Sequence, residues 1–175
     1  KYTQQGFATA FRVMANDVQQ GKSLGEFAVK QGVKTVAIVD DRTAYGQGLA
    51  DEFGKAAEAS GIKVVASEYT TDKATDFTAI LTSIKAKKPD VVFFGGMDAV
   101  AGPMLRQMKQ LGINAKFMGG DGICSGELPK LAAGAMADGQ VVCAEAGGVE
   151  GTQKAGMDEF YKKYNVTSLL TGNTG

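Results

Sequence analysis

The chain has 175 residues, enough for one domain with a sizeable core, and its 19 basic and 19 acidic side chains give a net charge of zero. A neutral chain offers no basic field for nucleic acid or an anionic membrane surface, and no apolar run approaches the roughly 20 residues of a membrane span. Histidine is absent, which excludes histidine-based catalysis and the common zinc sites. We therefore expect a soluble globular protein without metal or cofactor.

Short apolar or β-branched runs alternate along the chain with segments of helical periodicity. The runs typical of strands cover residues 11–13, 35–39, 63–67, 90–94, 115–118 and 140–144. The helical segments cover about residues 17–32, 44–60, 77–88, 100–111, 125–131 and 157–164. This alternation predicts an α/β fold: a doubly wound, mostly parallel sheet with helices on both faces, flavodoxin-like or Rossmann-like.

Apolar residues at helical spacing mark the faces that we expect to be buried. In the first helix these are Leu24, Phe27 and Ala28. We expect one α/β lobe over residues 1–164, followed by an irregular tail at 165–175 that reflects a truncation or a splice. Because the chain begins without Met and shows no signal peptide, we interpret it as a mature protein or an excised piece.

Candidate site residues follow three of the strands, at the edge where parallel sheets bind ligands. Tyr45 opens the helix after residues 35–39, where its ring and hydroxyl could face a ligand or simply pack on the loop. Gly96, Met97 and Asp98 follow residues 90–94. The glycine allows close approach of the backbone, and the methionine is an adaptable apolar wall. Asp98 could contact a ligand or act as the N-cap of the next helix.

A third loop follows residues 115–118 and contains Gly120 and Asp121. A carboxylate among glycines at the end of a strand suits an ammonium group, although an ordinary Asp-Gly turn has the same composition. Ser125 is the expected N-cap of the short helix that follows.

The two cysteines, Cys124 and Cys143, do not have the CxxC spacing of redox or metal motifs. They could be separate buried thiols. Alternatively, they could form a disulfide that closes a loop of about 20 residues and contributes roughly 3 kcal/mol.

The loops and their flanks resemble the periplasmic receptors for branched-chain amino acids, which are the solute-binding subunits of ABC importers. The resemblance lies in residues 37–50, 93–96 and 105–122, and in residues 11–13 followed by Asp17 and the Gln20–Gly21 pair. It extends over about residues 6–164. In that family two doubly wound lobes close over an amino acid, and this chain resembles the second lobe only.

The resemblance also implies roles for individual residues. Tyr45 matches a tyrosine that faces the ligand, and Asp121 matches an acidic residue that binds the α-ammonium group. Aspartate instead of glutamate shortens the reach by one methylene. Met97 stands where some relatives have tyrosine, which alters that contact. The pair Cys124 and Cys143 resembles a pair in a subset of these receptors, which favours the disulfide.

The implied function is that of a non-catalytic lobe of a bacterial periplasmic amino-acid receptor. Its partners would be an amino acid or a similar small solute, the missing first lobe, and the membrane subunits of an ABC importer, with no nucleic acid. Without the first lobe we expect weak binding or none, and an exposed surface that could pair with itself.

Two alternatives share the predicted sheet. One is the ligand-sensing domain of a transcription regulator, although no helix-turn-helix segment or basic patch is evident. The other is a flavodoxin-like or response-regulator-like module. Asp40 and Asp41 have the right position at the end of a strand for a response regulator, but no later acidic cluster or strand-end lysine accompanies them.

Overall fold

The computed structural model describes residues 5–10, 15–144, 159 and 162–163. In this part of the chain one sheet of five parallel strands has the order β2-β1-β3-β4-β5. The strands are β1 (Thr35–Asp40), β2 (Lys63–Tyr69), β3 (Val91–Gly95), β4 (Lys116–Gly119) and β5 (Val141–Cys143). The predicted parallel α/β sheet is confirmed.

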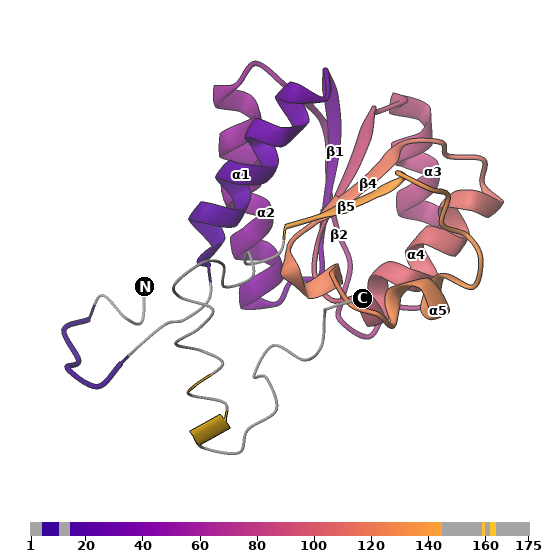
Figure 1. The fold of residues 1–175 in the computed structure, drawn as a ribbon. Helices are drawn as coiled ribbons and strands as arrows, with labels where there is room; N and C mark the ends of the chain where they lie inside the picture. The colour runs from indigo at the N-terminus through magenta and orange to yellow at the C-terminus, as the bar shows by residue number, and fades with distance from the viewer. Residues whose placement is uncertain (1–4, 11–14, 145–158, 160–161, 164–175) are drawn as a thin grey trace.

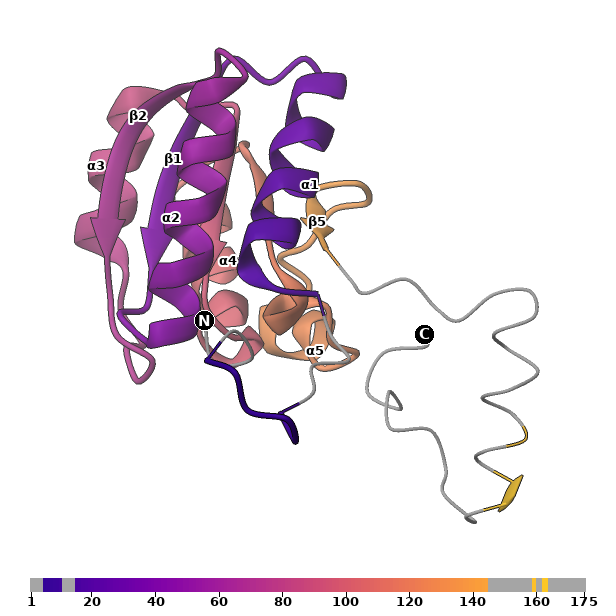
Figure 2. The same cartoon turned by 90° about the vertical axis from the view of Figure 1, so that its left-hand side faces the viewer.

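Helices cover both faces of the sheet, as Figures 1 and 2 show. They are α1 (Asp17–Lys30), α2 (Ala44–Ala59), α3 (Thr78–Lys87), α4 (Asp98–Gln110) and α5 (Leu128–Ala132). The first two lie on one face and the other three on the opposite face. A 3₁₀ turn, Asp121–Ile123, follows β4.

Each face of the sheet has its own apolar core. On the face of α1 and α2, the rings of Phe53 and Phe93 stack with their centroids 3.8 Å apart. On the other face, Phe94 and Phe117 pack with the buried side chains of α3, α4 and α5. The central strands β1 and β3 are buried on both sides, which explains why they read as continuous apolar runs rather than as an alternating pattern.

The predicted boundaries agree with the described elements to within about two residues, except that α5 begins at Leu128 instead of near Ser125. One buried face was also predicted wrongly. Phe27 is 38% exposed, whereas Leu24 and Ala28 are buried as expected. The reason is that α1 packs on α2 through Gly21 and Gly25, where an added Cβ would lie within 3 Å of α2 atoms. This contact turns the buried arc of α1 away from Phe27.

Three predictions fall largely or wholly outside the described residues: the strand at 11–13, the helix at 157–164 and the tail at 165–175. Among the helices that the structure describes, none combines the length and apolar character needed to span a membrane.

Candidate functional site

The predicted site residues come from loops that meet at the carboxyl ends of β1, β3 and β4. These three strands are neighbours in the sheet, so the loops that follow them lie side by side. Tyr45 stands after β1, Met97 and Asp98 after β3, and Asp121 after β4. The structure therefore gathers at one edge residues that are up to 76 positions apart in sequence.

Tyr45 is held in the first turn of α2 by a well-defined helix start. Thr43 is the N-cap, and its Oγ1 accepts a hydrogen bond from the Gly46 N–H at 2.9 Å. The Thr43 hydroxyl donates in turn to Asp41 Oδ1 at 2.6 Å. These hydrogen bonds fix the start of α2 and therefore the position from which the Tyr45 side chain projects.

Two glycines let this helix start touch the end of β3. A Cβ added at Gly46 would lie 2.4 Å from the carbonyl oxygen of Gly95, and one added at Gly95 would lie 2.2 Å from the carbonyl oxygen of Gly46. Only glycine at both positions permits this approach of backbone to backbone. As a result, Tyr45 reaches across to the loop after β4.

The Tyr45 hydroxyl bridges the side chain and the backbone of the 3₁₀ turn. It donates to Asp121 Oδ1 at 2.7 Å and accepts from the Gly122 N–H at 3.0 Å. Burial raises the pKa of Tyr45 above its ordinary value, and the hydrogen bond to Asp121 raises it further. The phenol therefore remains protonated and keeps donating to the carboxylate.

The backbone of the same turn has a second support from α1. Gln20 Oε1 accepts a hydrogen bond from the Asp121 N–H at 3.0 Å. The adjacent Gly120 has no room for a side chain, since an added Cβ would lie within 3 Å of atoms of Leu49, Gln20 and Tyr45. In the sequence, Gln20 is part of the family resemblance only, and nothing local indicates a role for it at the site.

Met97 and Asp98 lie at the start of α4, beside this turn. Met97 is 50% exposed and is the N-cap residue of α4, without a side-chain capping bond. A Cβ added at Gly122 would lie 2.9 Å from Met97 Sδ, so the two loops touch. Gly96 packs against Phe94 beneath them.

The interpretation of Asp98 as an N-cap is wrong. Asp98 is the first residue of α4, one position after the N-cap, and its carboxylate accepts a hydrogen bond from the Ser125 hydroxyl. The same hydroxyl accepts from the Leu128 N–H at 3.2 Å, so Ser125 supplies the expected contact to the start of α5, although the N-cap position itself is Glu127.

Cys124 and Cys143 form a disulfide, which confirms the pairing that the resemblance favoured. The bond connects the residue after the 3₁₀ turn with the last residue of β5, and their Cα atoms are 5.6 Å apart. It therefore restrains the Asp121 turn from the side opposite to Tyr45.

One oxygen of the Asp121 carboxylate has no partner in the part of the chain that the structure describes. Within the described residues, Asp121 Oδ2 has no hydrogen-bond partner and no cation pairs with this half-buried side chain. A carboxylate held by one oxygen can bind an ammonium group through the other. The half-exposed thioether of Met97 supplies apolar surface next to it.

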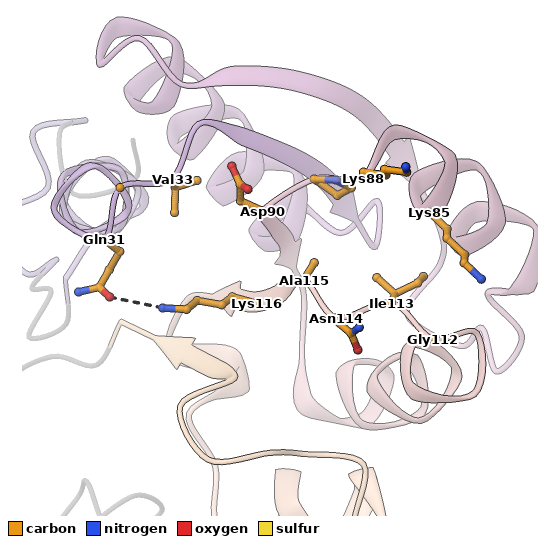
Figure 3. A pocket seen from close by; sticks show the side chains of 12 residues that line it. Gln31, Val33, Lys85, Lys88, Asp90, Gly112, Ile113, Asn114, Ala115 and Lys116 are labelled. Atoms are coloured by element: carbon orange, nitrogen blue, oxygen red, sulfur yellow. Dashed lines mark hydrogen bonds between the residues drawn. The ribbon is translucent and has the colours of Figure 1, made fainter.

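A separate cavity of about 550 Å³ lies at the opposite edge of the sheet. It is lined by the C-terminal ends of α1, α3 and α4 and by Lys85, Lys88 and Lys116, as Figure 3 shows. None of the predicted site residues lines it. Ligands of open parallel sheets bind at the carboxyl ends of the strands, so this cavity is not the candidate site.

The described part of the chain has the doubly wound parallel α/β architecture, in which ligands bind at the carboxyl ends of the strands. The chain belongs to the periplasmic binding protein family, whose model matches residues 2–170.

Proteins with related sequences are known from several bacteria. The chain is 40% identical over 133 residues to an amino acid binding protein of Pseudomonas aeruginosa, a match that covers 75% of this chain and 36% of that protein. It is 38% identical over 138 residues to Leu/Ile/Val-binding protein homolog 1 of Brucella abortus, a match that covers 78% of this chain and 37% of that protein. The chain thus spans well under half of the length of these relatives.

Solved structures have the same fold. A leucine binding protein, LivK, from Thermotoga maritima superposes with a TM-score of 0.79 at 24% identity, covering 93% of this chain and 47% of that one. A second structure is that of the branched-chain amino acid transporter substrate binding protein LivJ from Streptococcus pneumoniae, solved in complex with isoleucine. It superposes with a TM-score of 0.69 at 28% identity, covering 87% of this chain and 44% of that one.

Proposed function

We propose that this chain is the amino-acid-binding lobe of a receptor that serves an ABC importer, with a branched-chain or other aliphatic amino acid as its solute. One observation carries the proposal: Asp121 is held at the carboxyl edge by the Tyr45 hydroxyl and keeps one oxygen without a partner among the described residues. That oxygen would receive the α-ammonium group of the amino acid.

The neighbouring residues divide into direct and indirect roles. The Tyr45 hydroxyl donates its only proton to Asp121, so its part in binding is to orient the carboxylate, while its ring lines the site. Met97 would contact an aliphatic side chain. Gly96 and Gly120 let the loops approach closely, and Asp98 shapes the Met97 loop through Ser125.

The remaining partners follow from the family and the length of the relatives. A first lobe would supply the contacts to the α-carboxylate and close over the ligand. The receptor would act in the bacterial periplasm, hand its solute to the membrane subunits of the importer, and catalyse no reaction. The family match favours this role over a transcription regulator or a response-regulator-like module.

The test is an amide-resolved NMR titration of the chain with leucine up to about 10 mM. Two analogues accompany it: 4-methylpentanoate, which lacks the ammonium group, and 3-methylbutylamine, which lacks the carboxylate. We expect leucine and the amine to shift the amides of Tyr45, Met97 and Asp121, and 4-methylpentanoate to leave them in place.

The variant Asp121→Asn removes the negative charge and should weaken leucine binding about 10- to 100-fold, as expected for a hydrogen bond to a charged group. Asp138→Asn is the matched control, because this exposed carboxylate lies in the loop before β5, at the other edge of the sheet. Equal shifts with leucine and 4-methylpentanoate, or no shift with any ligand, would contradict recognition of an amino acid by this lobe.

A further inference from the structure

We propose that Gln20 is a positioning residue for Asp121: from the first turns of α1 it holds the 3₁₀ turn in the geometry that presents the carboxylate to the ligand. This inference rests on the proposed function, since it concerns how the same carboxylate is oriented.

The first observation is the burial of an uncharged polar side chain. Gln20 is only 5% exposed and lies on the buried arc of α1 with Leu24. A buried amide is costly unless it is hydrogen-bonded, and its Oε1 bonds to a backbone 101 positions away rather than within its own helix. An apolar residue could fill the same space without needing a hydrogen bond. We therefore infer that the function of the Gln20 amide oxygen is to accept the hydrogen bond from Asp121.

The second observation is that, among the residues that the structure describes, the Asp121 N–H has no acceptor other than Gln20 Oε1. Asp121 is the first residue of a three-residue 3₁₀ turn, and the first N–H groups of a helix have no acceptor within it. Gln20 Oε1 accepts from this N–H, while Tyr45 accepts from the next one, that of Gly122. The turn is therefore fixed by two side chains that approach it from different helices.

The third observation is that Gln20 itself is fixed. The helix begins with a capping box in which the side chains of Asn16 and Gln19 bond to each other's backbone N–H groups. One residue after Gln20, Gly21 packs so closely on α2 that an added Cβ would lie 2.7 Å from the Phe53 nitrogen. A rigid helix start and a close helix contact leave Gln20 little freedom to move.

Two substitutions separate positioning from simple core packing. Gln20→Met keeps a side chain of similar length but removes the acceptor, whereas Gln20→Glu keeps an acceptor oxygen. Gln47→Met is the matched control, because Gln47 is a glutamine at an exposed position of α2.

The first readout is amide hydrogen exchange in the ligand-free chain. In Gln20→Met we expect exchange at Asp121 to become about tenfold faster, the factor for one lost hydrogen bond. Gln20→Glu should restore the protection, and Gln47→Met should not change it. Unchanged exchange in Gln20→Met would overturn the proposal.

The second readout is the leucine titration. Gln20→Met should weaken leucine binding about tenfold, and it should cost nothing further in an Asp121→Asn background, because both changes disable the same carboxylate. Faster exchange with unchanged leucine affinity would reduce Gln20 to a structural role and overturn the proposal. If the unsubstituted chain does not respond to leucine, recognition of leucine by this lobe alone fails, while the exchange result still decides whether Gln20 holds the turn.

Discussion

At the scale of single residues, the site depends on glycines at positions where the neighbouring atoms leave no room for a Cβ atom. Gly120 is one of these, because three side chains from α1 and α2 surround it. Gly126, a few residues later, has nothing within 4 Å of an added Cβ. Neither glycine has a positive φ, so the space around the added Cβ decides the effect of a substitution, and the two make a matched pair.

We expect Gly120→Ala to destabilise the fold by about 1–3 kcal/mol through overpacking. An added Cβ would lie 2.4 Å from Leu49 Cδ2 and 2.7 Å from Gln20 Oε1, so at least one partner has to move. Urea unfolding followed by circular dichroism measures the effect. Gly126→Ala should change stability by less than about 1 kcal/mol. Equal effects of the two substitutions would show that crowding at Gly120 is not the determinant.

Tyr45→Phe tests the hydroxyl separately from the ring. The Gly122 N–H and one Asp121 oxygen lose their partner, so we expect a loss of about 1–2 kcal/mol in urea unfolding. Tyr69→Phe is the control, because Tyr69 is 61% exposed and its hydroxyl has no hydrogen bond to the described residues. A loss as large in Tyr69→Phe would contradict a specific role for the Tyr45 hydroxyl.

At the scale of elements, a disulfide and a hydrogen-bonded carboxylate connect segments that the backbone pairing of the sheet holds only weakly. The disulfide ties the turn after β4 to β5, a strand of three residues that is only partly buried. Asp90 ties the start of β3 to the start of β1, because its Oδ2 accepts from the N–H groups of Lys34 and Thr35 at 2.8 and 2.9 Å.

Removing the disulfide should lower stability by about 3 kcal/mol, the chain-entropy value for a loop of this length. The double variant Cys124→Ser and Cys143→Ser, compared with the parent in urea with and without a reductant, measures this loss. The reductant should lower the unfolding midpoint of the parent to that of the double variant and leave the variant unchanged. A parent midpoint that does not respond to complete reduction would contradict the prediction.

The hydrogen bonds of Asp90 predict that the free energy of unfolding depends on pH. The backbone N–H of Lys34, followed by the groups of Thr35, lowers the pKa of Asp90 below its ordinary value. Its contribution is therefore present above about pH 4, where the carboxyl of the unfolded chain ionises, and is lost as the pH falls through the lower pKa of the folded state.

The free energy of unfolding of Asp90→Asn should accordingly be lower than that of the parent at pH 7, and the difference should shrink between pH 4 and pH 2. The exposed Asp138→Asn variant is the control. A difference for Asp90→Asn that stays constant over this range would contradict the assignment.

The elements were largely predictable from the sequence because their signals are local. The run at residues 35–39 is apolar throughout, and the helix after it has its cap in Thr43 and its buried positions at regular spacing. The sequence also placed Tyr45 and Asp121 at one edge of the sheet. Their hydrogen bond was not predictable, because it depends on the order of the strands, and that order has no local signature.

Other features of the site depend on contacts of the same long-range kind. The bond from Gln20 to the Asp121 backbone connects residues that only the packing of α1 on α2 brings together. The pairing of Asp98 with Ser125 likewise could not be read from the position of Asp98 next to a helix start.

At the scale of the whole molecule, the two cores are connected through the central strands. In β1, Val36 and Ile38 belong to the core under α1 and α2, while Ala37 and Val39 belong to the core under the other helices. The strand β3 alternates in the same way. Neither core can lose its packing without disturbing strands on which the other depends.

We therefore expect the lobe to unfold in a single cooperative step, whichever face is weakened. Leu24→Ala on α1 and Leu81→Ala on α3 each truncate a buried leucine, one in each core, and each should cost about 2–5 kcal/mol. Because the chain has no tryptophan, tyrosine fluorescence reports on its five tyrosines, among them Tyr45, while far-ultraviolet circular dichroism reports on all helices. In both variants the two signals should change at the same urea concentration with an unchanged dependence on urea. Separate transitions in either variant would show that the two faces unfold independently, and the shared strands would then not couple the site to the opposite core.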